Sequence, residues 1–289
     1  MSFEPPGSPG DVVPLRLPRP AELFARRARR FRELAPGNPM GEFLDALGDV
    51  AEAQADALGS VPPALPVTLP PEGPPLRSMS HVRDPAWREA LASIVASLRS
   101  RPWPGPAAAA LRRLAGAWPE ELEAMADGVL AGTPAATDLA AAPFVGAALQ
   151  VYFSSLASVL PVEAVPRSEG GCPVCDSPPV AGLVLGDDKL RYLCCSLCSA
   201  EWNLTRIQCW NCRGTGGIQY LGLAGDEQGV KAEACGTCGA YLKLFYRERM
   251  PDAEPLADDV ASLTLDLLAA QEGWGRSGVN LFLLGGAEG

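Results

Sequence analysis

Four pairs of cysteines in the second half of the chain have the spacing of metal ligands. Two residues separate the cysteines within each pair, and successive pairs are 19, 10 and 22 residues apart. The pairs are Cys172 and Cys175, Cys195 and Cys198, Cys209 and Cys212, and Cys235 and Cys238. Four thiolates complete the tetrahedral coordination of one ion. The sequence therefore predicts two four-cysteine metal sites.

A site of four thiolates is closed, because no coordination position is left for water or substrate. Such sites stabilise structure rather than catalyse hydrolysis. Sulfur ligands suit zinc and also a single iron, and rubredoxin-like iron would permit one-electron chemistry where zinc would not. The spacing does not distinguish the two metals. Disulfides or a thioredoxin-like redox pair are alternatives that this spacing disfavours in an intracellular chain.

The two long intervals between the pairs have the pattern of β-hairpins. Each contains an apolar run, a turn with Gly and Asp, and a second run that returns to a cysteine pair. The ranges are 179–185, 186–188 and 189–195 in the first interval, and 218–223, 225–229 and 230–234 in the second. Each hairpin would bring two pairs together, so the chain contains an internal repeat of two zinc-ribbon-like modules.

Three further side chains near the pairs could take part in chemistry. Cys194 precedes the ligand Cys195, and in a strand its side chain should point to the opposite face. We interpret it as a buried spare thiol, with a reactive thiol as the alternative. Trp202 and Trp210 could bind a peptide or stack on a base, but we interpret both as packing around the modules.

The residues before the cysteines predict a helical domain. Apolar residues recur at helical spacing over 20–35, and again after Asn38, after Asp84 and over 107–117 and 119–130. A proline-rich segment, 59–75, is predicted to be a surface connector. Helical spacing returns after Pro251. The expected organisation is a flexible tail (1–19), a helical domain (20–165), two four-cysteine ribbons (166–203 and 204–250) and a C-terminal helix with a tail (251–289).

The first predicted helix carries a run of arginines: Arg26, Arg27, Arg29, Arg30 and Arg32. A charge run on a helix is usually a solvated face, and docking of an acidic partner is the alternative. The chain has one histidine, His81. In the sequence it is not accompanied by a group of Cys, Ser or carboxylate residues of the kind that forms a catalytic site. We interpret it as a loop or core residue with a hydrogen-bond partner rather than a catalyst.

Charge and apolar content constrain the environment and the partners. The formal net charge is −10, which disfavours nucleic acid as the main partner because phosphates would be repelled.

The uncharged segment 139–162 is long enough to span a bilayer, but its prolines, polar residues and lack of flanking basic residues favour a buried helix and no membrane insertion. The first residues lack a signal-peptide pattern, so we expect a cytoplasmic protein.

The sequence resembles the FdhE family of formate dehydrogenase accessory proteins. The resemblance rests on CPVCDSPPV, LRYLCCSLCSAEWNLTRIQCWNC and VKAEACGTCGAYLKLFY, and extends to RRARRFRELAPGNPMGEFL, RDPAWREAL and DDVASLTLDLLAAQEGWGRSGVNLFLL. The family's paired cysteine motifs fall on all eight cysteines named above. Cys194 stands where many relatives have His, and Asp176 replaces a frequent Gly. These two departures concern the local environment of the bound metal and the geometry of the turn after the first cysteine pair.

The resemblance implies a cytoplasmic factor that interacts with the catalytic subunits of respiratory, molybdenum- or tungsten-containing formate dehydrogenases. It also implies an α+β fold in which a helical domain precedes two tandem rubredoxin-like modules and a C-terminal helix closes the chain. The leading hypothesis is therefore a chaperone-like accessory protein, not an enzyme, with iron or zinc in two four-cysteine sites. A rubredoxin-like redox protein and a nucleic-acid-binding zinc-ribbon protein are the alternatives, and the chain could form a homodimer.

Overall fold

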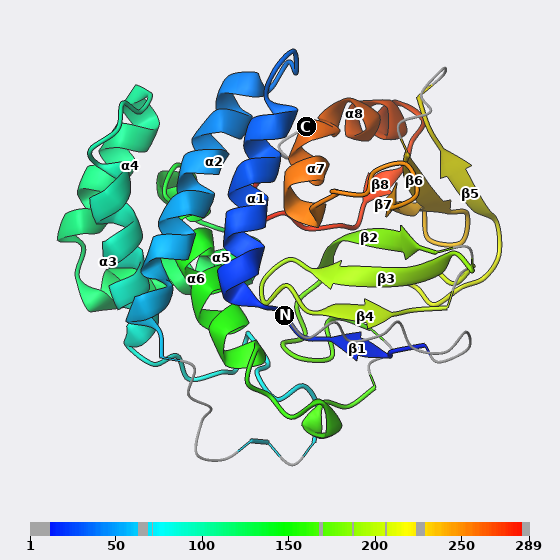
Figure 1. The fold of residues 1–289 in the computed structure, drawn as a ribbon, viewed down its shortest axis with the longest axis horizontal. Helices are drawn as coiled ribbons and strands as arrows, with labels where there is room; N and C mark the ends of the chain where they lie inside the picture. The colour runs from blue at the N-terminus through cyan, green and yellow to red at the C-terminus, as the bar shows by residue number, and fades with distance from the viewer. Residues whose placement is uncertain are drawn as a thin grey trace, which may run out of the picture.

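Helices form one side of the molecule and a mixed sheet forms the other (Figure 1). The computed structural model describes residues 12–62, 69–70, 72–167, 170–186, 188–205, 207–223 and 229–284. The predicted tail before residue 12, much of the proline-rich connector, Asp187 and the turn residues 225–228 lie outside these ranges. The α+β prediction is confirmed.

The helices follow the predicted apolar patterns closely. Their bounds are α1 (Pro20–Leu34), α2 (Gly41–Asp56), α3 (Ala86–Leu98), α4 (Gly105–Gly116), α5 (Pro119–Leu130), α6 (Ala142–Ala157), α7 (Pro255–Ala261) and α8 (Leu263–Gln271). Short 3₁₀ turns cover Ala57–Ser60, Ala136–Asp138 and Val162–Ala164. The side chain of Asp84 accepts a hydrogen bond from Ala86 N at 2.9 Å just before α3, because the first amide groups of a helix need an external acceptor.

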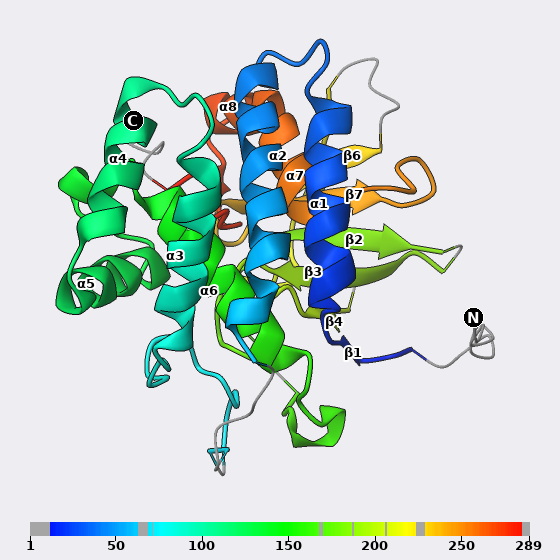
Figure 2. The same cartoon turned by 60° about the vertical axis from the view of Figure 1, so that its left-hand side comes forward.

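Helix α6 is the centre of the helical layer. All of its residues except Pro143 are buried, and it packs against α3 and α5 (Figure 2). A helix that is apolar on every side must be enclosed by other elements. In the part of the chain that the structure describes, no helix combines the length and the apolar character that crossing a membrane needs.

The strands form a single sheet, which has eight strands within the described residues. Their bounds are β1 (Leu15–Arg16), β2 (Pro179–Leu185), β3 (Leu190–Cys195), β4 (Glu201–Asn203), β5 (Ile218–Leu221), β6 (Val230–Cys235), β7 (Ala240–Tyr246) and β8 (Gly275–Arg276). The order is β1-β4-β3-β2-β7-β6-β5, with β8 beside β7. Both predicted hairpins are present, as β2–β3 and β5–β6.

The two ribbons are fused through a parallel pair of strands. Strand β2 of the first ribbon lies beside β7 of the second, with Gly182 opposite Leu244. A Cβ atom on Gly182 would lie 2.6 Å from a methyl carbon of Leu244, so the glycine allows this close approach. The predicted tandem modules therefore share one continuous sheet.

Two segments differ from the sequence-based expectation. Leu15 and Arg16 lie in the segment 1–19, which is expected to be a flexible tail, but they form β1 and pair with β4, and Leu15 is buried. The single C-terminal helix is divided into α7 and α8 at Ser262. Ser262 has φ −108° and ψ 27°, which departs from helical geometry, and the ammonium group of Lys243 donates to the carbonyl oxygen of Asp259 at 2.7 Å in the last turn of α7.

Helix α7 lies between the helical layer and the sheet (Figure 1). It packs against both α1 and β2. The segment after α8 also returns to the core, because Phe282 is buried and its ring lies 6.1 Å from that of Phe31. The last described residues thus join the first helix to the sheet.

Candidate metal centres

The first cysteine group lies where the first two pairs converge. Cys172 Sγ is 3.6 Å from Cys198 Sγ, and Cys175 Sγ is 3.4 Å from Cys195 Sγ. All four sulfur atoms lie within 4.8 Å of one another. A tetrahedral zinc ion with Zn–S bonds of about 2.3 Å needs S···S separations of about 3.8 Å. We call this group site 1, and it is able to hold a metal ion.

The second group repeats the same arrangement. Cys209 Sγ is 3.8 Å from Cys238 Sγ, and Cys212 Sγ is 3.6 Å from Cys235 Sγ. In both groups the first cysteine of one pair faces the second cysteine of the other pair. We call this group site 2. The grouping of the eight predicted ligands into these two sets agrees with the predicted internal repeat.

Backbone amide groups support the sulfur atoms. The amides of Leu197 and Cys198 each donate to Cys195 Sγ at 3.3 Å. In site 2, burial opposes ionisation of Cys235, but hydrogen bonds from the amides of Cys238 and Thr237 and from neighbouring thiols lower its pKa to about 6. Amide donors favour the thiolate form that binds metal.

The residue after each cysteine pair has a left-handed backbone conformation. The φ angles are 63° at Asp176, 59° at Ser199, 65° at Arg213 and 70° at Gly239. This conformation turns the chain back toward the sulfur atoms, and it is easy only for glycine. Asp176, which departs from the family pattern, therefore keeps the turn geometry, although a side chain there carries a conformational cost.

The two sites differ in exposure. All four cysteines of site 1 are buried, whereas in site 2 Cys212 is half-buried and Cys238 is exposed. Burial also raises the pKa of Cys209 to about 12, against backbone hydrogen bonds from Cys212 and Asn211 that lower it. At neutral pH, metal binding at site 2 must therefore displace a proton from Cys209.

Site 1 is held by the helical domain on two sides. The amide groups of Leu76 and Ser78 donate to the carbonyl oxygens of Val174 and Cys175 at 2.9 and 2.8 Å. On the other side, Gln150 of α6 donates to the carbonyl oxygen of Ser196 at 2.8 Å. Hydrogen bonds from the helical domain thus reach both pairs of site 1.

The interpretation of the arginine run as a solvated face was wrong for two of its members. Arg27 is fully buried, and its Nε lies 3.0 Å from Glu254 Oε1. Arg30 Nη2 lies 2.7 Å from Asp258 Oδ1. A buried charge needs a partner, and here the partners come from α7 and the residue before it. Acidic residues follow Pro251 in the sequence, but no local pattern assigns them to arginines more than 200 residues away.

The remaining candidates have structural partners. Cys194 is buried outside both cysteine groups, and burial together with Glu201 and Glu254 raises the pKa of its thiol well above the usual value. Trp202 is buried, and Trp210 donates from its ring nitrogen to Ser277 Oγ at 2.9 Å. His81 Nε2 lies 3.0 Å from the hydroxyl of Tyr152. These contacts agree with the packing interpretation of each residue.

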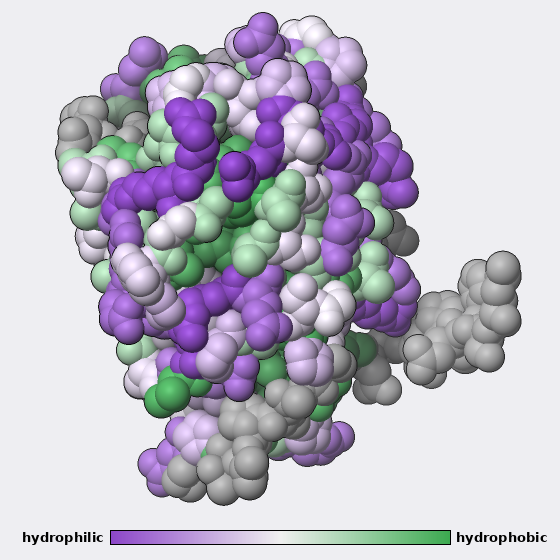
Figure 3. Space-filling view, turned by 90° about the vertical axis from the view of Figure 1, so that its left-hand side faces the viewer, coloured by the Kyte–Doolittle hydropathy of each residue, from purple (hydrophilic) through white to green (hydrophobic). Residues whose placement is uncertain are grey.

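The outer face of the helical layer carries a shallow recess between α3, α4 and α5. It has a volume of about 210 Å³ and is lined by apolar residues that include Leu91, Val95, Leu114 and Leu122. Figure 3 views this side of the molecule and shows apolar surface framed by hydrophilic side chains. A larger recess of about 1300 Å³ lies between α2, the start of α4 and α6.

The helical layer contacts one four-cysteine group, and the fused ribbon next to it carries a second, which defines a protein with two groups that are each able to hold a metal ion. The comparisons with known proteins identify the class more closely. Family models for the N-terminal, central and C-terminal domains of FdhE match residues 12–169, 171–206 and 207–283. The chain belongs to the FdhE family of formate dehydrogenase accessory proteins.

Similar proteins match over almost their whole length. The FdhE homolog of Cronobacter sakazakii is 40% identical over 288 residues, which cover 95% of this chain and 92% of the relative. Protein FdhE of Salmonella paratyphi A has the same identity and coverage. The crystal structure of the FdhE protein from Pseudomonas aeruginosa is 38% identical and superposes with a TM-score of 0.85, covering 95% of this chain and 99% of that one.

Proposed function

We propose that this protein is a chaperone-like accessory factor that binds the catalytic subunit of formate dehydrogenase and supports its maturation. The proposal rests on one observation: FdhE family models match residues 12–169, 171–206 and 207–283, and the matched chain contains two complete four-cysteine groups. In this proposal the protein acts by binding in the cytoplasm rather than by catalysis.

The metal ions have a structural role in the proposed function. The eight cysteines hold two ions, iron or zinc, and site 1 fixes the ribbon against the helices through Gln150 and the segment 76–78. Structural metal sites of this kind contribute folding free energy directly. A rigid joint between the two layers presents both of them to the client as one surface.

The test is capture of the client from cells that express it. The tagged protein is purified without oxygen from its own cells, and co-purified proteins are identified by mass spectrometry. We expect the formate dehydrogenase catalytic subunit to be enriched with the wild type, to be lost with Cys172→Ser and to be kept with Cys194→Ser. Circular dichroism and gel filtration of each variant separate loss of binding from loss of fold. Absence of the subunit from repeated wild-type captures, with the enzyme expressed, would contradict the proposal.

One observation favours a second candidate function, electron transfer by rubredoxin-like iron. Cys238 of site 2 is exposed and Cys212 is half-buried, and an electron-transfer centre needs such access to its partner. Metal analysis and visible spectroscopy of protein from its own cells test this candidate. Reducible iron in site 2 would support it, whereas zinc in both sites would eliminate it.

A further inference from the structure

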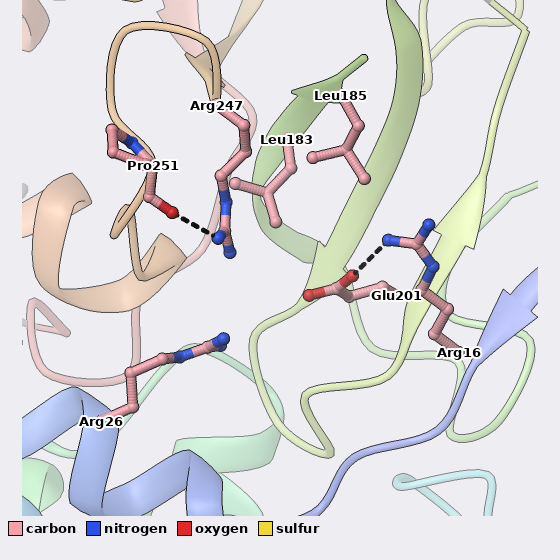
Figure 4. A pocket seen from close by; sticks show the side chains of 7 residues that line it. All are labelled: Arg16, Arg26, Leu183, Leu185, Glu201, Arg247 and Pro251. Atoms are coloured by element: carbon pink, nitrogen blue, oxygen red, sulfur yellow. Dashed lines mark hydrogen bonds and ion pairs between the residues drawn. The ribbon is translucent and has the colours of Figure 1, made fainter. Parts of the chain in front are cut away.

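A charged recess lies where four parts of the chain meet. It has a volume of about 460 Å³ and lies between β1, α1, the first ribbon and the segment after β7. Its lining residues are Arg16, Arg26, Leu183, Leu185, Glu201, Arg247 and Pro251 (Figure 4). The recess lies outside both metal sites, since none of these residues is a cysteine of either group.

The positive charge in this recess exceeds the negative charge. Three guanidinium groups face one carboxylate, and that carboxylate is shared with Arg16, whose Nη1 lies 3.6 Å from Glu201 Oε2. Arg247 donates from Nη1 to the carbonyl oxygen of Pro251 at 2.7 Å, which is a neutral acceptor. Within the described residues, no carboxylate lies within ion-pair distance of Arg26 or Arg247.

The two unmatched arginines also have unsatisfied donors. The Nε atoms of Arg26 and Arg247 are both buried, and neither has a hydrogen-bond partner in the described part of the chain. Arg27, the next residue on the same helix as Arg26, does have hydrogen-bond partners: it donates to Glu254, Gln150 and Ser199. A buried donor without an acceptor costs free energy and calls for an acceptor that is absent.

The side chains converge on one place. Figure 4 shows the guanidinium groups of Arg26 and Arg247 extending toward each other across the recess, with the carboxylate of Glu201 at its side. The leucines of β2 supply an apolar wall. Planar guanidinium groups bind carboxylates through paired, charge-assisted hydrogen bonds, and the apolar wall would pack against the carbon atoms of an organic ligand.

We propose that this recess binds an organic carboxylate through Arg26 and Arg247, with Leu183 and Leu185 contacting its carbon skeleton. The carboxylate can come from a free small acid or from an acidic side chain of a protein. The volume is in the range of sites that hold small organic molecules. The proposal does not rest on the proposed accessory function, and no cysteine of either metal site lines the recess.

The experiment measures binding of two carboxylate probes and one inorganic anion to the full-length, metal-loaded chain. Glutarate represents the free acid, and a blocked tetrapeptide with two glutamates represents the protein-borne carboxylate. Inorganic phosphate is the third probe, and all titrations are made by calorimetry at constant ionic strength. Thermal denaturation supplies a second readout, because a ligand that binds the folded state raises Tm.

The decisive variants are Arg26→Gln and Arg26→Lys, since Arg26 has no described pair whose loss would unfold the protein. Arg112→Gln is the matched control, because Arg112 is an exposed arginine on α4. We expect millimolar or tighter binding of a carboxylate probe, at least about fivefold weaker in Arg26→Gln and intermediate in Arg26→Lys. The control should bind as the wild type does.

The pattern of binding identifies the source of the carboxylate. Preference for glutarate indicates a free acid, and preference for the peptide indicates a protein partner; both support the site. The proposal is overturned if neither carboxylate binds, if Arg26→Gln binds as tightly as the wild type, or if phosphate binds more tightly than both carboxylates.

Discussion

Arg27 Nε lies 3.0 Å from Glu254 Oε1, and both side chains are almost completely excluded from solvent. The pair connects α1 to the residue that precedes α7, 227 residues further along the chain. Arg27 also donates to Gln150 Oε1 and to Ser199 Oγ. One guanidinium group therefore ties together the helical layer, the C-terminal segment and the turn after Cys198.

Removal of the Arg27 guanidinium should lower the stability of the folded protein. We expect Arg27→Met to lower the free energy of unfolding by about 3–5 kcal/mol, because the buried carboxylate of Glu254 would lose its cationic partner. The double variant Arg27→Met with Glu254→Gln should recover part of that loss. Urea denaturation measures both changes. Arg29→Ala is the control: its pair with Glu33 is solvent-exposed, so its cost should stay below about 1 kcal/mol. Equal costs for the two single variants would contradict the assigned role.

The metal in site 2 should leave before the metal in site 1. Cys238 is exposed and all site 1 cysteines are buried, so a chelator reaches site 2 without prior opening of the fold. Release followed with a chromogenic chelator should show a fast and a slow phase. Cys235→Ser should remove the fast phase, and Cys198→Ser the slow one. A fast phase that survives Cys235→Ser would reverse the assignment.

Metal affinity at site 2 should fall toward acid pH. The pKa of Cys209 is about 12 and that of Cys235 is about 6. Near neutrality Cys235 is already a thiolate, whereas Cys209 and Cys212, whose pKa is also raised, must release protons when metal binds. Below about pH 6, Cys235 is protonated as well, so one more proton competes with the metal and the dependence on pH steepens. Competition with a chelator of known affinity, measured from about pH 5 to about pH 8, tests this. A constant slope through this range would contradict the lowered pKa of Cys235.

The left-handed backbone conformation of the residue after each cysteine pair can be tested by two opposite substitutions, one to glycine and one from glycine. Arg213→Gly should raise the free energy of unfolding by about 0.5–1 kcal/mol, since glycine adopts a φ of 65° without steric cost. Gly239→Ala should lower it by about 1–2 kcal/mol. No heavy atom lies within 4 Å of the Cβ position there, so that loss would be purely conformational. Denaturation of the metal-loaded variants measures both, and changes of the same sign would exclude this explanation.

Substitution of the adjacent residues Cys194 and Cys195 should have different effects on the number of metal ions bound. Cys194→Ala should leave two metal ions bound per chain, because Cys194 is buried outside both groups. Cys195→Ala should lose one ion and destabilise the contact with the helices. Metal content measured by mass spectrometry on purified protein distinguishes them. Loss of an ion in Cys194→Ala would assign that thiol a role in coordination.

Local sequence signals were sufficient for much of the fold. The bounds of α5 and β2 agree with the predicted ranges, because proline, glycine and apolar spacing mark where each element begins and ends. The four cysteine pairs were likewise found, since ligand spacing is a local property. Residue type indicates the left-handed turn after a pair only at Gly239, because Asp176, Ser199 and Arg213 occupy the corresponding positions after the other pairs.

Contacts between distant residues could not be predicted in the same way. The partner of Arg27 lies at the other end of the chain, and helical spacing alone placed the arginine on a polar face. The parallel pairing of β2 with β7 depends on how two hairpins pack, which neither hairpin pattern contains. Strand β1 has only two residues, too few for a recognisable alternation.

The position of α7 between α1 and β2 has a consequence for how the protein folds during synthesis. The first helix leaves the ribosome long before Glu254 and Asp258 are made, so Arg27 is without its carboxylate partner until the end of synthesis. Contacts of such high sequence separation slow folding and expose unfinished surfaces. The four thiolates of site 1 come from residues 172–198, so the metal can be bound before Glu254 is made. Metal binding would then hold the first ribbon in shape until the end of the chain arrives and completes the interface.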